Sequence, residues 1–164
     1  MEEAAYCMEQ ATDRCKMYCG EKNQMYSALS EELARMYNAA GRREESLACH
    51  LSVRNQLLKN GYREGSLLLM VDNNMSVVYL DLGKPEEAIP YLTEALELAK
   101  ENGLVGPAVA EPTWNLARVY RALGDEEKED IYLKAAVEGF RECYPPEHPK
   151  RIAAEQRLKE RQEE

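Results

Sequence analysis

Residues 116–124 read LARVYRALG, and the pattern of these residues recurs along the chain. A tyrosine followed by a glycine one helical turn later occurs three times: Tyr37 with Gly41, Tyr79 with Gly83, and Tyr120 with Gly124. Successive tyrosines are separated by 79 − 37 = 42 and 120 − 79 = 41 residues. A period of this length, with helix-like sequence in between, indicates stacked helical repeats.

Each repeat is predicted to contain two helices, one before the glycine and one after it. In the first helix an apolar residue, a small residue and the tyrosine occupy positions i, i+1 and i+4, which share one helix face. The glycine ends this helix, where a left-handed residue costs least. The predicted first helices are Gln24–Ala39, Gly65–Leu82 and Ala110–Leu123, and the predicted second helices are Arg42–Lys59, Pro85–Asn102 and Asp125–Cys143.

The same register extends to both ends of the chain. Residues 2–19 resemble a second helix without its first, and 107 + 42 = 149 places a further first helix at Pro149. Glu129 makes the last full repeat a weaker match, because it replaces a small residue. We predict one domain over residues 1–164, with a partial repeat at 1–20, repeats at 22–61, 63–103 and 107–144, and a capping helix at 147–164.

Composition limits the classes of function. The formal net charge of −9 opposes binding to nucleic acid, whose phosphates would be repelled. The longest apolar run, Leu67–Val71, is far too short to span a membrane. The residues near Met1 lack the basic flank of a secretory signal, so we expect no such signal. We therefore expect a protein that binds neither nucleic acid nor membrane. The odd number of cysteines favours reduced thiols and so a reducing, cytoplasmic setting.

The five cysteines raise two alternatives. Cys15 and Cys19 lie one helical turn apart and could offer two thiolates to a metal, with Cys7 or His50 completing the site. The favoured interpretation is that all five are reduced, small apolar residues, so we expect no metal. No phosphate-binding glycine loop, nucleophile elbow or zinc motif is present, so we expect no enzyme and no cofactor. A Cys49–His50 nucleophile pair is disfavoured because adjacent helical residues do not face each other.

Three segments together resemble the tetratricopeptide repeat family, in the 42-residue variant found in kinesin light chains and related bacterial proteins. They are residues 116–125, the segment Gly83–Ile89, and the proline-flanked segment Tyr144–Pro149. The resemblance implies an all-α, right-handed α-solenoid of antiparallel helix pairs. It also implies that first helices line a concave wall, and that the chain is a non-catalytic scaffold for a protein or peptide.

Counting along the first helices gives the predicted peptide-binding residues of that concave wall. Asparagine both donates and accepts hydrogen bonds, and the resemblance implies that Asn74 and Asn115 bind a peptide backbone. Arginines could bind carboxylates or pair locally with glutamates, and Trp114 could be an anchor or part of the core. The predicted residues are Arg35, Asn38, Asn73, Asn74, Val77, Trp114, Asn115, Arg118 and Arg121.

One more specific ligand is disfavoured. Some tetratricopeptide domains hold the terminal carboxylate of a chaperone with a clamp of lysine, asparagine and arginine. Of the five matching positions only Asn74 fits, and the two glutamates would repel the ligand; these positions are Glu31, Arg35, Asn74, Glu111 and Asn115. We expect no binding of chaperone tails.

Two alternative functions stay open. The helix at residues 2–19 exposes an apolar face that lacks its packing helix, so the chain could form a homodimer through Ala4, Ala5, Met8 and Ala11. The chain could also be the peptide-sensing part of a larger bacterial regulator.

Overall fold

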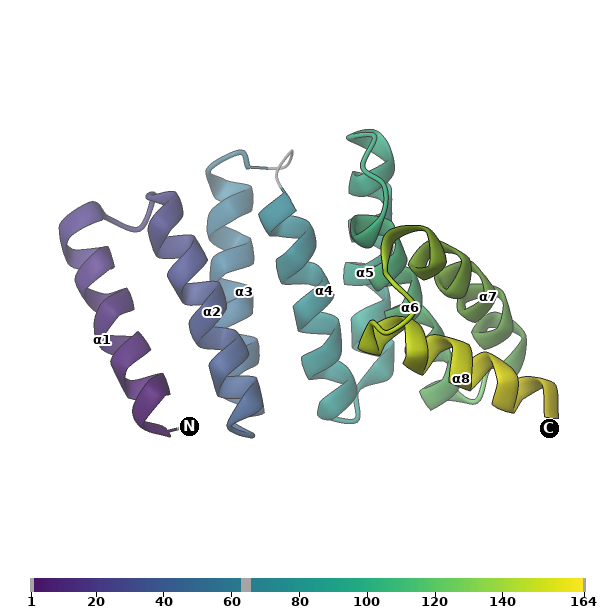
Figure 1. The fold of residues 1–164 in the computed structure, drawn as a ribbon. Coiled ribbons are helices and arrows are strands. Elements are labelled where there is room, and N and C mark those ends of the chain that lie inside the picture. The colour runs from purple at the N-terminus through teal and green to yellow at the C-terminus, as the bar shows by residue number, and fades with distance from the viewer. Residues whose placement is uncertain (1, 63–65, 164) are drawn as a thin grey trace.

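The computed structural model describes residues 2–62 and 66–163, and these residues form eight helices and no strand. Figure 1 shows the helices side by side along the chain. Gly65, where one helix was predicted to begin, and the predicted domain boundaries at residues 1, 63 and 164 lie outside the described residues. The helices are α1 (Glu2–Cys19), α2 (Gln24–Ala39), α3 (Arg43–Lys59), α4 (Ser66–Asp81), α5 (Pro85–Glu101), α6 (Pro107–Leu123), α7 (Glu126–Cys143) and α8 (Pro149–Glu163).

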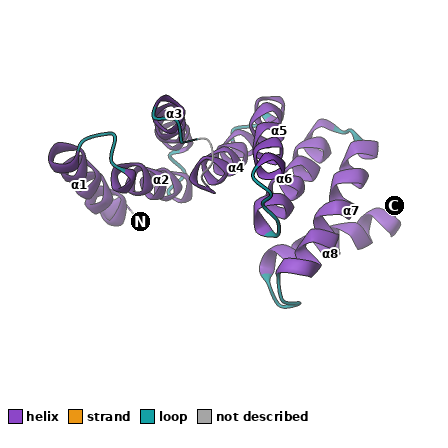
Figure 2. Cartoon of the chain, turned by 90° about the horizontal axis from the view of Figure 1, so that it is seen from above, coloured by secondary structure: helices purple, strands orange, loops and turns teal. Residues whose placement is uncertain are grey.

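The helices form an α-solenoid of antiparallel pairs, which confirms the predicted fold class. Three complete pairs follow one another: the first pair is α2/α3, the second is α4/α5, and the third is α6/α7. Viewed from above, α3 and α5 lie on one side of the row, and α2 and α4 lie on the other (Figure 2). First helices also contact the next first helix, as α4 contacts both α2 and α6. The wall formed by α2, α4, α6 and α8 is called the first-helix wall below.

The glycines end the first helices as predicted. Gly41, Gly83 and Gly124 have φ angles of +79°, +68° and +73°, which residues with a Cβ atom rarely adopt. The residue after each glycine donates its backbone N–H to the carbonyl of the tyrosine four residues before that glycine, at 2.9, 2.9 and 3.0 Å. These bonds close the helix ends and direct the chain into the second helix.

One helix begins earlier than the sequence pattern indicated. We predicted a start at Ala110, but α6 begins at Pro107. Proline is well suited to the first helical position because its missing N–H has no intrahelical partner there. The earlier start extends α6 by one turn toward α8.

The core confirms the pattern of small and large residues. Ala34, Ser76 and Ala117 are at most 2% exposed, so the second helix of each pair packs closely against the first. In the second and third pairs the tyrosine ring stacks on a tyrosine of the second helix, with centroids 5.6 Å apart for Tyr79–Tyr91 and 5.3 Å apart for Tyr120–Tyr132.

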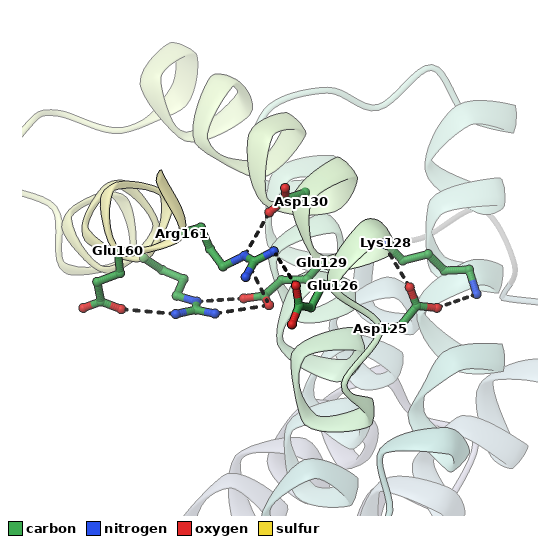
Figure 3. Close-up of polar contacts among 8 residues, drawn as sticks. Asp125, Glu126, Lys128, Glu129, Asp130, Glu160 and Arg161 are labelled. Atoms are coloured by element: carbon green, nitrogen blue, oxygen red, sulfur yellow. Dashed lines mark hydrogen bonds and ion pairs between the residues drawn. The ribbon is translucent and has the colours of Figure 1, made fainter. Parts of the chain in front are cut away.

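Ion pairs attach α8 to the third pair (Figure 3). Glu129, which weakened the sequence match, is only 3% exposed and accepts hydrogen bonds from Arg157 Nε at 2.7 Å and Nη2 at 3.2 Å. Arg161 donates to Asp130 at 3.1 Å. The carboxylate of Glu129 therefore serves as the partner of Arg157, whose side chain is 12% exposed, which a small residue at this position could not do.

Candidate functional site

Two asparagines connect successive first helices through side-chain hydrogen bonds. Asn74 of α4 donates its Nδ2 to Glu31 Oε1 of α2 at 2.6 Å. Asn115 of α6 donates its Nδ2 to Asn73 Oδ1 of α4 at 2.8 Å. The two bonds are equivalent in the repeat, because 31 + 42 = 73 and 74 + 41 = 115. The asparagines therefore fix the register between neighbouring first helices.

Glu31 is held from a second side. Its Oε2 lies 2.7 Å from His50 Nδ1 of α3, and these side chains are 2% and 1% exposed. A carboxylate at such depth needs hydrogen-bonding partners to offset its lost hydration. Asn74 and His50 supply them, so α2, α3 and α4 share one buried polar cluster.

The first-helix wall contains a hollow of about 460 Å³ beside these asparagines. This volume lies within the range typical of ligand pockets, about 300–1,000 Å³. Its lining comes from four helices of the same type, and apolar side chains predominate. The lining residues, called the hollow below, are Arg35, Leu67, Leu69, Met70, Asn73, Asn74, Pro107, Ala108, Glu111, Pro112 and Lys150.

Charged groups from α2, α6 and α8 are among the residues that line the hollow. Arg35 of α2 pairs with Glu32 at 2.8 Å, and Lys150 of α8 pairs with Glu111 of α6 at 2.6 Å. Glu111 also accepts a hydrogen bond of 2.5 Å from the hydroxyl of Tyr144, and burial together with this bond raises the tyrosine's pKa. Arg35 and Lys150 are about half exposed, so water screens these pairs and a ligand can compete for the cations.

Three of the predicted binding residues line the hollow: Arg35, Asn73 and Asn74. Asn115 is instead 4% exposed, and its side chain bonds to Asn73 and accepts from Arg118 at 3.0 Å. Burial lowers the pKa of Arg118, while Asp81 opposes this effect. Asn115 and Arg118 therefore form hydrogen bonds inside the protein.

The other four predicted residues also lie away from the hollow. Trp114 packs on Phe140 of α7, with centroids 6.4 Å apart, as part of the C-terminal core. Asn38 donates to Asp81 at 3.4 Å, Val77 is half-buried and Arg121 is exposed. A peptide-binding role for these residues stays a prediction.

Sequence reasoning missed one charged residue of the hollow, Lys150. We interpreted the segment at 147–164 as a cap and did not count its residues on the wall. A signal was present, since 108 + 42 = 150 places Lys150 at the position of Ala108. The repeat register therefore assigns it to the same face.

The residues considered for metal binding or catalysis do not form such sites in the part of the chain that the structure describes. No group of three or more metal-binding side chains is found among these residues. Burial and the nearby Glu31 raise the pKa of the Cys49 thiol to about 11, and its Sγ lies 3.1 Å from the carbonyl of Ser30. His50 Nδ1 contacts Glu31, and no hydrogen bond joins His50 to Cys49 among the described residues. None of the described helices is long and apolar enough to cross a bilayer.

Comparison with known proteins confirms the resemblance to the tetratricopeptide repeat family. Residues 67–142, which cover the second and third pairs, match the family model described as tetratricopeptide repeat. No curated protein matches the chain.

Solved structures extend the likeness to the whole array. One of them is a Q17M crystal structure from Podosopora anserina, described as kinesin light chain nearly identical TPR-like repeats. Its sequence is 23% identical to this chain and its TM-score is 0.81. The match covers 99% of this chain and 77% of that one. BtubC (BKLC) from P. vanneervenii is 18% identical with a TM-score of 0.78, and the match covers 99% of this chain and 73% of that one. At these identities the likeness establishes the fold.

Proposed function

We propose that this chain is a non-catalytic scaffold that captures an extended peptide segment in the hollow. The observation that carries the proposal is that four first helices converge on one concavity that combines apolar lining with two asparagines. The apolar part includes Leu67, which is half-buried, and Met70, which is 42% exposed, so apolar side chains of a ligand would displace water there. The asparagines supply hydrogen bonds for a peptide backbone.

The charges at the hollow fit a peptide better than a small ion. Arg35 and Lys150 lie on different helices and are already paired with Glu32 and Glu111. A single anion would have to separate both pairs, and Glu111 would repel it. A peptide can exchange partners with each pair separately while its apolar side chains supply the binding energy.

A phage library displaying random linear peptides tests this proposal. The wild-type chain should enrich a family of peptides, and Met70→Lys should reduce capture of those peptides at least about tenfold, because it places a charge on the apolar floor. Ile131→Lys is the matched control, since Ile131 is 58% exposed on α7, away from the hollow. Failure to enrich any peptide, or equal effects of the two variants, would refute the proposal. The same selection applies if the chain is the peptide-sensing part of a larger regulator.

A second proposal is self-association through α1, favoured by its exposed apolar side chains. Tyr6, Met17 and Tyr18 are 60%, 73% and 81% exposed. The face expected from the sequence is corrected in part, because Ala5 is fully buried and Met8 is half-buried, whereas Ala4 and Ala11 are exposed. Sedimentation at several concentrations should reveal a dimer that Tyr18→Lys dissociates. A wild-type chain that stays monomeric at all concentrations contradicts this second proposal and leaves the first unaffected.

A further inference from the structure

Glu31 and His50 are buried ionisable residues behind the first-helix wall, and neither lines the hollow. They nevertheless reach it through one side chain, because Asn74 bonds to Glu31 and also lines the hollow. Asn74 is therefore a side chain through which the two buried residues can influence a ligand in the hollow.

The chemistry of Glu31 determines which end of the Asn74 side-chain amide, Nδ2 or Oδ1, is turned toward Glu31. An ionised carboxylate has two oxygens that accept hydrogen bonds and no donor. His50 engages Oε2, so Oε1 is left to accept from Asn74, and only Nδ2 of Asn74 can donate. The carbonyl oxygen Oδ1 of Asn74 is then the end without a donor among the described residues.

Asn73 presents the opposite polarity. Its Oδ1 accepts from Asn115, which leaves its Nδ2 without an acceptor among the residues that the structure describes. Neighbouring residues lining the hollow thus offer one acceptor, Asn74 Oδ1, and one donor, Asn73 Nδ2. A peptide bond carries the complementary N–H and C=O groups.

We propose that Glu31 and His50 are positioning residues for ligand capture, which hold Asn74 with its carbonyl oxygen available to an N–H of the bound peptide. The proposal rests on the proposed function of the hollow and adds a chemical requirement on the ligand. A segment that lacks an N–H at this point, such as one with proline there, binds less tightly because the Asn74 carbonyl then loses its partner.

The orientation itself can be measured without a ligand. In NMR exchange experiments, the side-chain amide protons of Asn74 should exchange at least about tenfold more slowly than those of Asn23, because Nδ2 of Asn74 is bonded to a buried carboxylate. Asn23 is the reference because it is exposed and only its Oδ1 is engaged, by the N–H of Met25. Equally fast exchange in the wild-type chain would overturn the proposed orientation.

Two variants of Glu31 separate positioning from general stability. Glu31→Gln retains an acceptor for Asn74 and can donate to the other tautomer of His50, so slow exchange should persist. Glu31→Leu removes the acceptor, and the exchange of Asn74 should accelerate about tenfold. The proposal is overturned if the side-chain amide of Asn74 in the glutamine variant exchanges as fast as that of Asn23. Because the wild-type and glutamine results decide this point, it does not depend on whether the leucine variant folds.

A double-mutant cycle connects the orientation to binding. With a peptide enriched in the selection above, Glu31→Leu should weaken affinity about tenfold in the wild-type background and have no further effect in an Asn74→Ala background. Additive losses would show that Glu31 does not act through Asn74. If the selection enriches no peptide, the proposed function fails, while the exchange experiment still decides the orientation.

Discussion

The first and second helix pairs have the same backbone plan but different interiors. Adding 42 to each position aligns Glu31 with Asn73, Cys49 with Tyr91, His50 with Leu92, and Arg54 with Leu96. In the first pair, His50 bonds to Glu31, and Arg54 donates its Nε to Asp72 at 2.7 Å and also pairs with Glu94. In the second pair, Leu92 is fully buried in the larger apolar core.

This comparison indicates that helix pairs can stack with the same spacing whether the residues between their helices are apolar or polar. The small residue, the tyrosine and the glycine are common to both pairs, and they set the helix approach and the helix end. Polar residues can replace leucines behind them only as matched partners, because a buried charge without a partner is costly. The predictions below test this view, and the change in the free energy of unfolding that each expects becomes smaller from one to the next.

Transferring the second pair's residues into the first should work for both partners together and fail for one alone. His50→Leu copies Leu92 but removes a partner of the buried Glu31, and we expect a loss of about 3 kcal/mol in the free energy of unfolding. Adding Glu31→Asn copies Asn73 as well, and Asn74 can then donate to residue 31 as Asn115 donates to Asn73. The double variant should lie within about 1 kcal/mol of the wild type.

Urea unfolding followed by circular dichroism measures both variants. Repeat arrays can unfold in parts, so transition midpoints should be compared before free energies are fitted. A single His50→Leu variant as stable as the wild type would show that Glu31 needs no partner. If the double variant is no more stable than His50→Leu alone, the residues of the second pair cannot replace Glu31 and His50 together.

The same contrast explains how far the fold could be predicted from sequence. The period, the triplets and the glycines specify helix pairs locally, so the solenoid and most helix bounds followed from them. The start of α6 at Pro107 did not, because no apolar residue of the triplet pattern marks that turn. The role of Glu129 was also hidden, since its partner Arg157 lies 28 residues away in a helix interpreted as a solvent-facing cap.

The hollow could be predicted only in part. Periodicity assigned Arg35, Asn73 and Asn74 to the correct wall, but it gives the face of a helix and not its contact with the next one. Asn115 was therefore counted as a ligand-binding residue although it bonds to Asn73. The available signal was that an acceptor, Glu31 or Asn73, precedes each such asparagine by 43 or 42 residues.

A second prediction uses the ion pair that joins Arg54 of the first pair to Asp72 of the second pair. Asp72 of α4 is fully buried, its Oδ1 accepts from Arg54, and its Oδ2 has no hydrogen-bond partner among the described residues. Burial raises its pKa to about 6, although Arg54 acts in the opposite direction. The ordinary value is about 3.9, so the carboxyl holds its proton more tightly in the folded chain than in the unfolded one.

The sign of the pH dependence follows directly. Asp72 contributes stability that is fully present below about pH 4 and is lost as the pH rises through about 6. Asp72→Asn lacks this titration, so the wild type should lose about 2 kcal/mol relative to the variant between pH 4 and 7. Urea unfolding of both proteins across this range measures the difference, which cancels the other carboxylates. Parallel stability curves would contradict the prediction.

The smallest expected effect concerns the tyrosine stacks, which the first pair lacks because Cys49 occupies the position of Tyr91. The ring centroids of Tyr91 and Tyr79 are 5.6 Å apart, and the ring planes are inclined by 15°. Such aromatic pairs stabilise a protein by about 0.5–1.5 kcal/mol beyond the effect of their buried area. Tyr91→Leu should therefore destabilise the chain by about 1 kcal/mol. Tyr62→Leu is the control, since Tyr62 is 39% exposed and lies outside both the stacks and α1, so this change should leave the unfolding midpoint unchanged. If Tyr91→Leu also leaves the unfolding midpoint unchanged, the stacks contribute nothing measurable to stability. A difference in stability between the two pairs would then come from the positions of His50 and Arg54.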